Sequence, residues 1–173
     1  MKRIYLLRHA KSSRDDPTIE DFDRPLAPRG ARDCRTMGRV LAEGRIAPAL
    51  ILCSAARRTR DTLDGIFPTL PEGSAVKIEK RLYLADGAHL LRRLERLDDS
   101  IETVLVIGHN PGLQELALRL GGAGKASLLA RLKAKFPTGA LAEIAYAGRH
   151  WADLSAGQTR LTGLTAPKEA DGP

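Results

Sequence analysis

Short runs of apolar residues recur along the chain and predict the strands of a sheet. Three runs are uninterrupted, which is typical of strands buried on both faces, as in a parallel sheet; they are Ile4–Leu7, Leu50–Cys53 and Val104–Ile107. Three further segments are weaker candidates, the last of them expected at an edge of the sheet: Leu141–Tyr146, Val76–Ile78 and His150–Leu154.

Between these runs, apolar residues recur three and four positions apart, the spacing that gives a helix one apolar face. The faces are formed by Cys34, Met37, Gly38 and Leu41, by Leu90, Leu91, Leu94 and Leu97, and by Leu113, Leu116, Ala117 and Leu120. Residues 127–135 predict a fourth, more basic helix. Asp86 is expected to cap the second helix and Asn110 the third, with Pro111 at its first position. Strands that alternate with helices predict an α/β fold with a mainly parallel sheet.

The length of 173 residues predicts one compact domain. Hydrophobic residues make up 43% and charged residues 28% of the chain, the composition of an ordinary globular protein. We assign residues 1–165 to a single domain and expect residues 166–173, which contain two prolines and a glycine, to form a flexible tail. The glycine-rich segment Gly121–Gly124 follows a predicted helix and is expected to be its C-terminal cap and a loop.

No apolar run approaches the roughly 20 residues of a membrane-spanning helix. Only four apolar residues, Ile4–Leu7, follow the basic start of the chain, whereas a secretory signal needs about 7 to 15. The two cysteines, Cys34 and Cys53, suit a reducing compartment. We therefore expect a cytoplasmic protein with no membrane partner.

The chain is basic, with a formal net charge of +7 and a pI near 9.8. This charge suits either a protein that binds nucleic acid or an enzyme that acts on anionic substrates. Aromatic residues make up only 4% of the chain, which leaves few side chains for stacking on bases. The positions of the arginines must therefore decide between these two classes.

Polar residues follow each of the three strong strands: Arg8 with His9, then Ser54, and His109 with Asn110. Ligands of α/β sheets bind beyond the carboxyl ends of the strands, and parallel strands bring those ends to one edge. The two histidines are therefore expected to be neighbours. The helix expected to start at Asn110 adds free backbone N–H groups and the positive end of a helix dipole, which favour an anion.

Arginines accompany these strand ends, because Arg8 precedes one histidine while Arg57 and Arg58 follow Ser54. Guanidinium groups match phosphate oxygens, and a neutral imidazole can attack phosphorus. The residues thus predict an anion site and phosphoryl transfer, although a histidine at a strand end can also be an ordinary polar residue with satisfied hydrogen bonds.

The remaining histidines do not favour a metal site. His89 and His150 are expected to be surface or structural residues. A site formed by His9, His109 and Cys53 would lack the close pair of ligands that is typical of metal centres. We therefore expect neither a metal ion nor another cofactor.

Five segments of the chain follow one another in an order known from one family. They are Leu7–Ser12, Asp23–Gly30, Ser54–Thr62, Arg81–Ala85 and Val106–Pro111. The first contains R-H-A-K-S, a variant of an R-H-G signature, and the last contains G-H-N-P around the second histidine. Together they resemble the histidine phosphatase superfamily, which implies its three-layer α/β/α, phosphoglycerate mutase-like fold. The small size, without a large inserted lid, resembles the phosphohistidine phosphatase branch of SixA-like proteins.

The resemblance implies a role for each matching residue. His9 would be the nucleophile that becomes phosphorylated, while Arg8, Arg58 and His109 would hold the phosphoryl oxygens. Three more residues are expected to contact the substrate: Arg24, Ser54 and Asn110. For Arg24, a salt bridge with Asp21 or Asp23 is the alternative.

Because Arg57 and Arg58 are adjacent, either of them could be the arginine of the third motif, Ser54–Thr62. Counting from both ends of the motif favours Arg58 for the phosphate contact and leaves Arg57 as a surface or docking residue. The sequence departs from the family's pattern at two positions of this segment, because Ala55 replaces a proline and Thr59 an alanine. The turn after Ser54 is therefore expected to be less rigid.

The family's ester-cleaving members carry a glutamate as general acid, and Leu84 stands at the matching position here. An alkoxide leaving group needs a proton as it departs, whereas imidazole leaves easily because its conjugate acid has a pKa near 6.5. This departure therefore favours cleavage of P–N over P–O bonds. Asp21, Asp23 or Asp86 could each replace the missing acid, and each could equally be a helix cap or part of a surface ion pair.

These inferences predict a metal-independent phosphatase that works through a phosphohistidine intermediate and acts on phosphohistidine of a signalling protein, for example a histidine-phosphotransfer protein. The first alternative is a phosphatase or phosphomutase for a small phosphorylated substrate. The second is a basic nucleic-acid-binding module without enzymatic activity. The predicted site already uses several arginines, so we expect no nucleic-acid partner.

Overall fold

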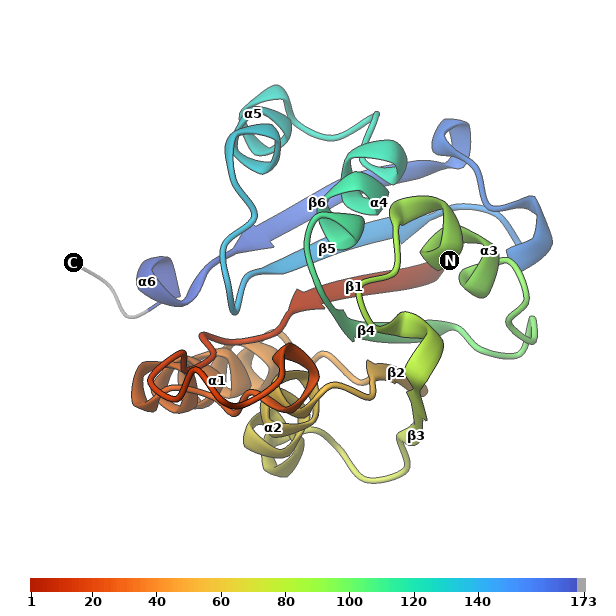
Figure 1. Cartoon of the computed structure of the whole chain (residues 1–173). Coiled ribbons are helices and arrows are strands. Elements are labelled where there is room, and N and C mark those ends of the chain that lie inside the picture. Colours follow the sequence, from red (N-terminus) through yellow and green to blue (C-terminus); the bar gives the residue numbers. More distant parts are fainter. Residues whose placement is uncertain (171–173) are drawn as a thin grey trace.

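The computed structural model of the chain describes residues 1–170. Within them, six strands form one sheet in the order β3-β2-β4-β1-β5-β6 (Figure 1). The strands are β1 (Lys2–Arg8), β2 (Leu50–Ser54), β3 (Ala75–Glu79), β4 (Thr103–Gly108), β5 (Leu141–Tyr146) and β6 (Thr159–Thr165). The first four are parallel, whereas β5 is antiparallel to β1 and β6 is antiparallel to β5. The predicted α/β fold with a mainly parallel sheet is confirmed.

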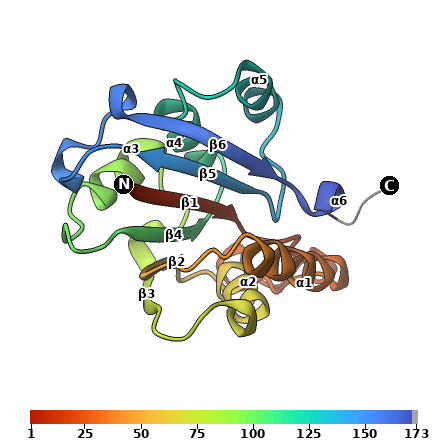
Figure 2. The same ribbon diagram turned by 180° about the vertical axis from the view of Figure 1, so that it is seen from behind.

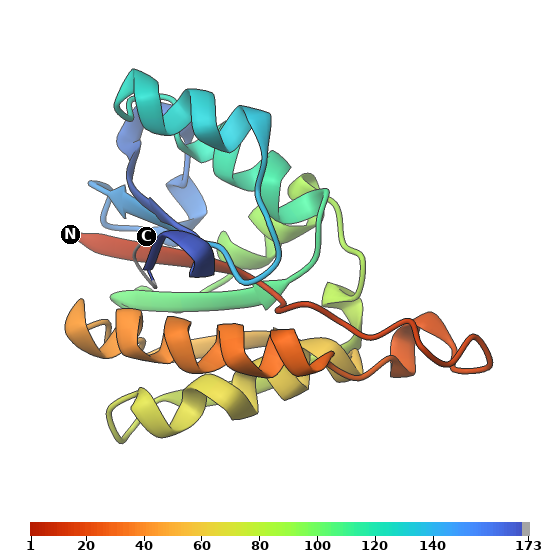
Figure 3. The ribbon, with the colours of Figure 1, turned by 90° about the vertical axis from the view of Figure 1, so that its left-hand side faces the viewer.

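Helices cover both faces of the sheet and give the molecule three layers (Figure 3). One face carries α1 (Pro28–Glu43) and α2 (Arg57–Ile66), and the other carries α3 (Gly87–Leu94), α4 (Gly112–Leu120) and α5 (Ala126–Ala134). Figure 2 shows the same layers from behind. Short 3₁₀ helices lie in the connections, at Asp21–Asp23, Phe67–Thr69, Lys80–Leu82, Trp151–Asp153 and Ala156–Gln158. No helix within residues 1–170 is long and apolar enough to cross a membrane.

Alternating side chains of the strands pack into two separate cores. On β1, Ile4 and Leu6 face the core beneath α3, α4 and α5, while Tyr5 and Leu7 face the core beneath α1 and α2. A strand that is buried on both sides needs apolar residues at every position, which explains the uninterrupted runs in the sequence. The apolar faces predicted for α1, α3 and α4 are buried against these cores.

The C-terminal edge of the sheet differs from the prediction. The sequence predicts an edge strand at His150–Leu154, but Trp151–Asp153 forms a 3₁₀ helix there. The Trp151 side chain is fully buried beside Tyr146, and its indole N–H donates to the carbonyl of Ile101 at 2.9 Å. The strand at this edge of the sheet is β6. Its register against β5 shifts between Glu143 and Ile144, so a search for apolar and polar residues that alternate strictly does not identify it.

The end of the described chain also differs from the prediction of a flexible tail. Pro167–Ala170 forms a short helix, α6, that packs against α1. The carboxylate of Glu169 accepts a hydrogen bond from the N–H of Ala166 at 3.1 Å and pairs with Arg131 at 2.5 Å. The rest of the predicted tail, residues 171–173, lies outside the described residues.

The helix caps follow the prediction in one case and depart from it in another. Asp86 caps α3 as predicted, since its carboxylate accepts from the N–H of His89 at 2.7 Å. However, α4 begins at Gly112 with Pro111 as its cap, so the predicted cap residue Asn110 lies outside the helix. Its side-chain amide instead donates to the carbonyl of Phe136 at 3.1 Å.

Candidate active site

The two predicted site histidines meet because β1 and β4 are paired in parallel. The register places Arg8 beside Gly108, so His9 and His109, the next residues of the two strands, leave the sheet at the same edge. The backbone N–H of His9 donates to the Gly108 carbonyl at 3.0 Å and holds the two strand ends together. The centroids of the two imidazole rings lie 5.3 Å apart.

His9 presents one ring nitrogen to the site. Its Nδ1 lies 2.8 Å from the carbonyl oxygen of Ala10, a contact that requires Nδ1–H as the donor, so the neutral ring has its lone pair on Nε2. Burial lowers the pKa of His9 to about 4, and the neighbouring guanidinium groups act in the same direction. The imidazole is therefore neutral near pH 7, the state in which it can attack phosphorus.

Arg58 contacts the unprotonated ring nitrogen of His9, Nε2. Its Nε–H donates to His9 Nε2 at 3.3 Å, and its side chain is only 3% exposed. Arg57 precedes it as the first residue of α2 and points elsewhere, because successive helical residues face different directions. The Arg57 side chain is 52% exposed and pairs with Asp61 at 3.7 Å. The structure thus places Arg58, and not Arg57, beside His9.

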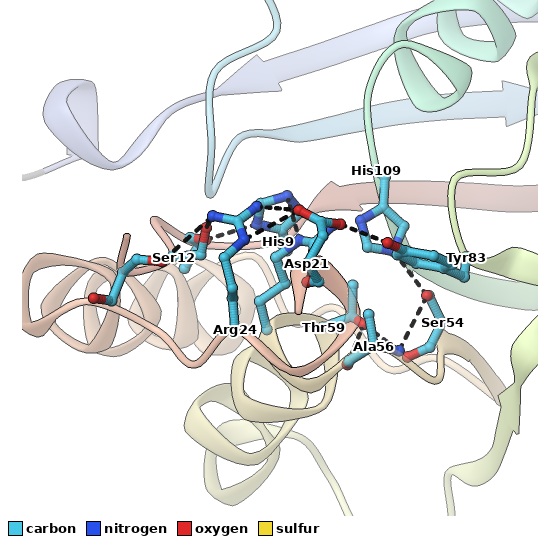
Figure 4. A network of polar contacts seen from close by, with 12 residues as sticks. His9, Ser12, Asp21, Arg24, Ser54, Ala56, Thr59, Tyr83 and His109 are labelled. Carbon is cyan, nitrogen blue, oxygen red and sulfur yellow. Dashed lines mark hydrogen bonds and ion pairs between the residues drawn. The ribbon is translucent and has the colours of Figure 1, made fainter. Parts of the chain in front are cut away.

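One carboxylate organises this cluster (Figure 4). Asp21 Oδ2 accepts hydrogen bonds from Arg58 Nη2 at 3.0 Å and from the Tyr83 hydroxyl at 2.5 Å. Its Oδ1 accepts from Arg24 Nε at 3.0 Å. The hydrogen bond from Tyr83 and the two guanidinium groups hold the pKa of the Asp21 carboxyl well below its usual range. Asp21 is therefore an ionised counterion, and in this arrangement it has no proton to give to a leaving group.

Arg24 joins this carboxylate to the loop after β1. Its Nη1 donates to the Ser12 hydroxyl at 3.0 Å and to the Ser13 carbonyl at 3.3 Å, while its other nitrogens hold Asp21. Its side chain also lines the cavity at His9. The salt bridge and the position at the site, which the sequence leaves as alternatives for Arg24, are both present.

One ring nitrogen of His109, Nδ1, has no hydrogen-bond partner within residues 1–170. Ser54 Oγ lies 2.7 Å from His109 Nε2 and accepts the N–H of Ala56 at 3.5 Å, and the Ser54 hydroxyl can donate its own hydrogen to Nε2. With Nε2 as acceptor, the ring carries its proton on Nδ1, which is buried and has no hydrogen-bond partner within residues 1–170. Burial lowers the pKa of His109 to about 3, so this ring is neutral as well. Its Nδ1–H can donate to an oxygen of a bound anion.

The Ser54 side chain contacts His109 and does not reach the cavity. The sequence predicts a substrate contact for Ser54, but the residue is fully buried and lies outside the cavity lining. The hydroxyl of Thr59 lies 2.7 Å from the carbonyl oxygens of both Ser54 and Ala56. Thr59 thereby stabilises the turn that Ala55 was expected to leave less rigid.

Residues 136–139, which precede β5, hold two more of the predicted site residues, Arg8 and Asn110. The carbonyl of Phe136 accepts from Arg8 Nη1 at 2.8 Å and from Asn110 Nδ2 at 3.1 Å. In the described part of the chain, Arg8 Nε and Asn110 Oδ1 are buried and have no hydrogen-bond partner. Gly139, with a φ of +76°, donates its N–H to the carbonyls of Arg8 and His9 at 3.1 Å. This segment therefore holds Arg8 and Asn110 at the cavity, where both were predicted.

The cavity at His9 is small and positively charged. It has a volume of about 130 Å³, whereas pockets for drug-sized ligands occupy about 300–1,000 Å³. No carboxylate of residues 1–170 lines it, and its cationic lining consists of Arg8, Lys11, Arg14, Arg24 and Arg58. This size and charge suit a compact oxyanion such as a phosphoryl group.

Several residues that line or support this cavity were not predicted from the sequence: Lys11, Ser12, Arg14, Tyr83 and Thr138. Lys11 and Ser12 directly follow the R-H-A motif, so their adjacency to His9 was a usable signal. Tyr83 packs edge-on against His109, with ring centroids 5.4 Å apart. Tyr83 and Thr138 are distant from His9 in the sequence and reach it only through the fold.

The other candidate acids lie elsewhere. Asp86 is the cap of α3, and Asp23 is exposed and outside the cavity lining. Leu84, which stands where ester-cleaving relatives carry their acid, does line the cavity. Among residues 1–170, no three histidine, cysteine or carboxylate side chains are grouped so that they could hold a metal ion.

Comparison with known proteins agrees with this geometry. Residues 4–83 match the sequence profile of the histidine phosphatase superfamily (branch 1). An uncharacterized protein of Mycobacterium tuberculosis is 37% identical over 94% of this chain and 100% of its own length. Two solved structures of proteins named SixA superpose with TM-scores of 0.80. The protein from Agrobacterium tumefaciens is 30% identical over 96% of this chain and 98% of its own. The protein from Nakamurella multipartitia is 28% identical over 96% of both chains.

This chain therefore belongs to the histidine phosphatase superfamily, on its SixA-like branch. Its fold is the phosphoglycerate mutase-like α/β fold. The resemblance carried by the five sequence motifs is confirmed, and it supports a phosphatase.

Replacement of Arg58 is expected to weaken anion binding far more than replacement of Arg57. A charge-assisted hydrogen bond contributes about 1.5–3 kcal/mol, so Arg58→Gln should lower the affinity for inorganic phosphate at least about tenfold. Arg57→Gln should change it less than about threefold, because its guanidinium faces solvent. Isothermal titration calorimetry measures both affinities. Equal losses in the two variants would contradict the geometry.

His9 is expected to remain neutral from pH 8 down to about pH 5. Burial and the neighbouring arginines disfavour the imidazolium and lower the pKa of His9 to about 4, so protonation should occur only near that value. Arg58→Gln removes one positive charge and should raise this pKa. Nuclear magnetic resonance of the imidazole nitrogens follows the titration. A wild-type midpoint near 6.5, unchanged in the variant, would refute this account.

Proposed function

We propose that this protein is a metal-independent phosphatase that removes the phosphoryl group from phosphohistidine on another protein, with His9 as its nucleophile. The observation that carries the proposal is the neutral Nε2 of His9 in a small cationic cavity that no carboxylate of residues 1–170 lines. This arrangement attracts a phosphoryl group and provides a nucleophile, but it provides no carboxylic acid for a basic leaving group.

In the first step, His9 Nε2 attacks the phosphorus atom of the substrate. A bond forms between Nε2 and phosphorus, and the bond between phosphorus and the substrate's imidazole nitrogen breaks. Solvent can protonate the second nitrogen of the substrate ring beforehand, so that it departs as neutral imidazole. The guanidinium groups of Arg8 and Arg58 support the transition state by binding the phosphoryl oxygens, as does the Nδ1–H of His109.

In the second step, water attacks the phosphorus atom held by His9. An oxygen–phosphorus bond forms, the nitrogen–phosphorus bond breaks, and its electron pair returns to Nε2. The excess proton of the water passes to solvent, and inorganic phosphate leaves. The carbonyl of Ala10 supports both steps, because it holds the Nδ1–H of His9 and thereby keeps Nε2 as the reacting nitrogen.

The nature of the leaving group favours phosphohistidine over phosphate esters. An alkoxide is strongly basic and needs a proton donor, but Asp21 is ionised and Leu84 has no proton to give. Imidazole needs no such donor. A small-ester phosphatase or phosphomutase would require a general acid from outside the described cavity lining, so it remains the second candidate.

Trapping of the phosphorylated enzyme tests the proposed nucleophile. With a ³²P-labelled phosphohistidine peptide and rapid quenching, wild-type protein should carry label that is labile in acid and stable in base. His9→Ala should show no label and no turnover, because no other group supplies the reacting nitrogen. His109→Gln should slow the reaction but still accept label on His9. Acid-stable label, or label on His109 in the wild type, would reject the mechanism.

The substrate class is tested by a ratio of specificity constants. We expect kcat/KM for a phosphohistidine protein to exceed that for a sugar phosphate by at least about 10², or about 2.7 kcal/mol of transition-state stabilisation. Leu84→Glu should lower this ratio by accelerating ester cleavage, since it adds an acid at the cavity. Leu84→Gln is the matched control without a proton to donate. A wild-type ratio near one would favour the small-ester function.

A further inference from the structure

A second, larger cavity lies between β3 and α3. It has a volume of about 610 Å³ and shares no lining residue with the cavity at His9 in the described part of the chain. β3 contributes Lys77 and Glu79, and the helical side contributes Arg92, Arg93 and Arg96. We call this cavity the β3–α3 groove.

The positive charge of the β3–α3 groove is largely uncompensated. Of its cationic side chains, Arg93 pairs with Glu79 at 2.7 Å. The carboxylate of Asp98, the other acidic residue of the lining, accepts hydrogen bonds from its own turn at Ser100. The remaining cations make no ion pair or hydrogen bond within residues 1–170; they are Lys77, Arg81, Arg92 and Arg96. Four unpaired cations in one groove favour an anionic ligand of extended shape.

The same groove borders an open edge of the sheet. Among the described strands, β3 is the last and pairs only with β2. The N–H of Ala75 and the carbonyl of Glu79 bond toward β2, so alternation directs the N–H and carbonyl groups of Val76 and Ile78 outward. The side chains of Val76 and Ile78 are 40% and 52% exposed. An extended peptide can hydrogen-bond to such an edge as an added strand.

The β3–α3 groove is connected to the active site through a short piece of chain. Arg81 lies in the 3₁₀ helix Lys80–Leu82, which is followed directly by Tyr83 and Leu84. Tyr83 contacts Asp21 and packs against His109, and Leu84 lines the cavity at His9. When a protein places a phosphorylated side chain in the cavity at His9, neighbouring parts of that protein therefore lie close to this groove.

We infer that the β3–α3 groove binds an acidic, extended segment of the protein whose phosphoryl group enters the cavity at His9. The segment adds a strand to the edge of β3 and places its carboxylates against Lys77, Arg92 and Arg96. This assignment of the segment to the substrate rests on the proposed function. A nucleic acid fits less well, because no phenylalanine, tyrosine or tryptophan of residues 1–170 lines the groove for base stacking and the edge of β3 offers a peptide ladder.

A binding experiment tests the groove without relying on activity. The probe is a fluorescein-labelled 12-residue peptide of alternating glutamate and threonine, measured by anisotropy in about 50 mM salt, where surface charges are weakly screened. The double variant Arg92→Glu/Arg96→Glu should weaken binding at least tenfold. The control Arg32→Glu/Arg35→Glu reverses two exposed charges on α1, gives the same net charge, and should weaken binding less than threefold.

Val76→Pro tests strand addition separately. The N–H of Val76 faces outward, so proline removes a donor to the peptide while the ladder with β2 is kept, and the affinity should fall. Val76→Thr should bind like wild type. If Val76→Pro does not fold, the charge-reversal pair still decides whether the groove binds the peptide. Failure of wild type to bind, equal losses in the two charge-reversal variants, or tighter binding of a labelled single-stranded oligonucleotide through Arg92 and Arg96 would overturn the inference.

A kinetic experiment tests whether the segment belongs to the substrate. Two phosphohistidine peptides carry the same flexible glycine-serine linker, followed by an alternating glutamate-threonine tail or by a neutral glutamine-threonine tail. Wild type should have a KM at least fivefold lower for the acidic tail, and Arg92→Glu/Arg96→Glu should abolish this difference without changing kcat for the neutral peptide. Equal KM values in wild type would overturn the assignment to the substrate. If wild type turns over neither peptide, the proposed function fails, and the anisotropy measurement still decides whether the groove binds an acidic segment.

Discussion

The site depends on a buried guanidinium group placed against a neutral imidazole. Arg58 Nε lies 3.3 Å from His9 Nε2, and the Arg58 side chain is almost completely buried. Burial is the main cause of the lowered pKa of His9, and the positive charge of Arg58 lowers it further, so the same guanidinium that attracts an anion also helps to keep the nucleophile unprotonated. The carbonyl of Ala10 completes the arrangement by fixing which nitrogen carries that lone pair.

A buried guanidinium requires a counterion, and Asp21 fills this role. Removal of a charge from water costs several kcal/mol unless it is paired and hydrogen-bonded. Asp21 meets this requirement for Arg58 and also holds Arg24, while Tyr83 donates to the same carboxylate. The consequence is chemical as well as structural: a carboxylate stabilised as a counterion is a poor proton donor. Asp21 therefore stabilises the buried guanidinium groups and, for the same reason, supplies no proton to the site.

The molecule separates two tasks that both involve positive charge. The cavity at His9 is small, and the guanidinium groups of Arg8, Arg24 and Arg58 are held by carbonyl and carboxylate oxygens, which suits a phosphoryl group in a defined orientation. The β3–α3 groove is larger, and its free cations are Lys77, Arg81, Arg92 and Arg96 on exposed backbone segments. Long, unpaired side chains of this kind adapt to an extended partner and define no single geometry. The high net charge is thus divided between a rigid site and an open surface.

The sequence alone determined the elements and the motif residues, because these depend on local spacing. Apolar runs identified five strands, and motif order selected His9, Arg8, Arg58 and His109. It could not identify β6 or the 3₁₀ helix Trp151–Asp153, because a shifted register and a contact with Ile101 depend on distant chain segments. Three properties of the site were decided only by tertiary structure: the ionised state of Asp21, the contact of Tyr83 with it, and the support of Arg8 by Phe136. Each arises from groups far apart in sequence, whose electrostatic and hydrogen-bond energies depend on distances that only the folded chain sets.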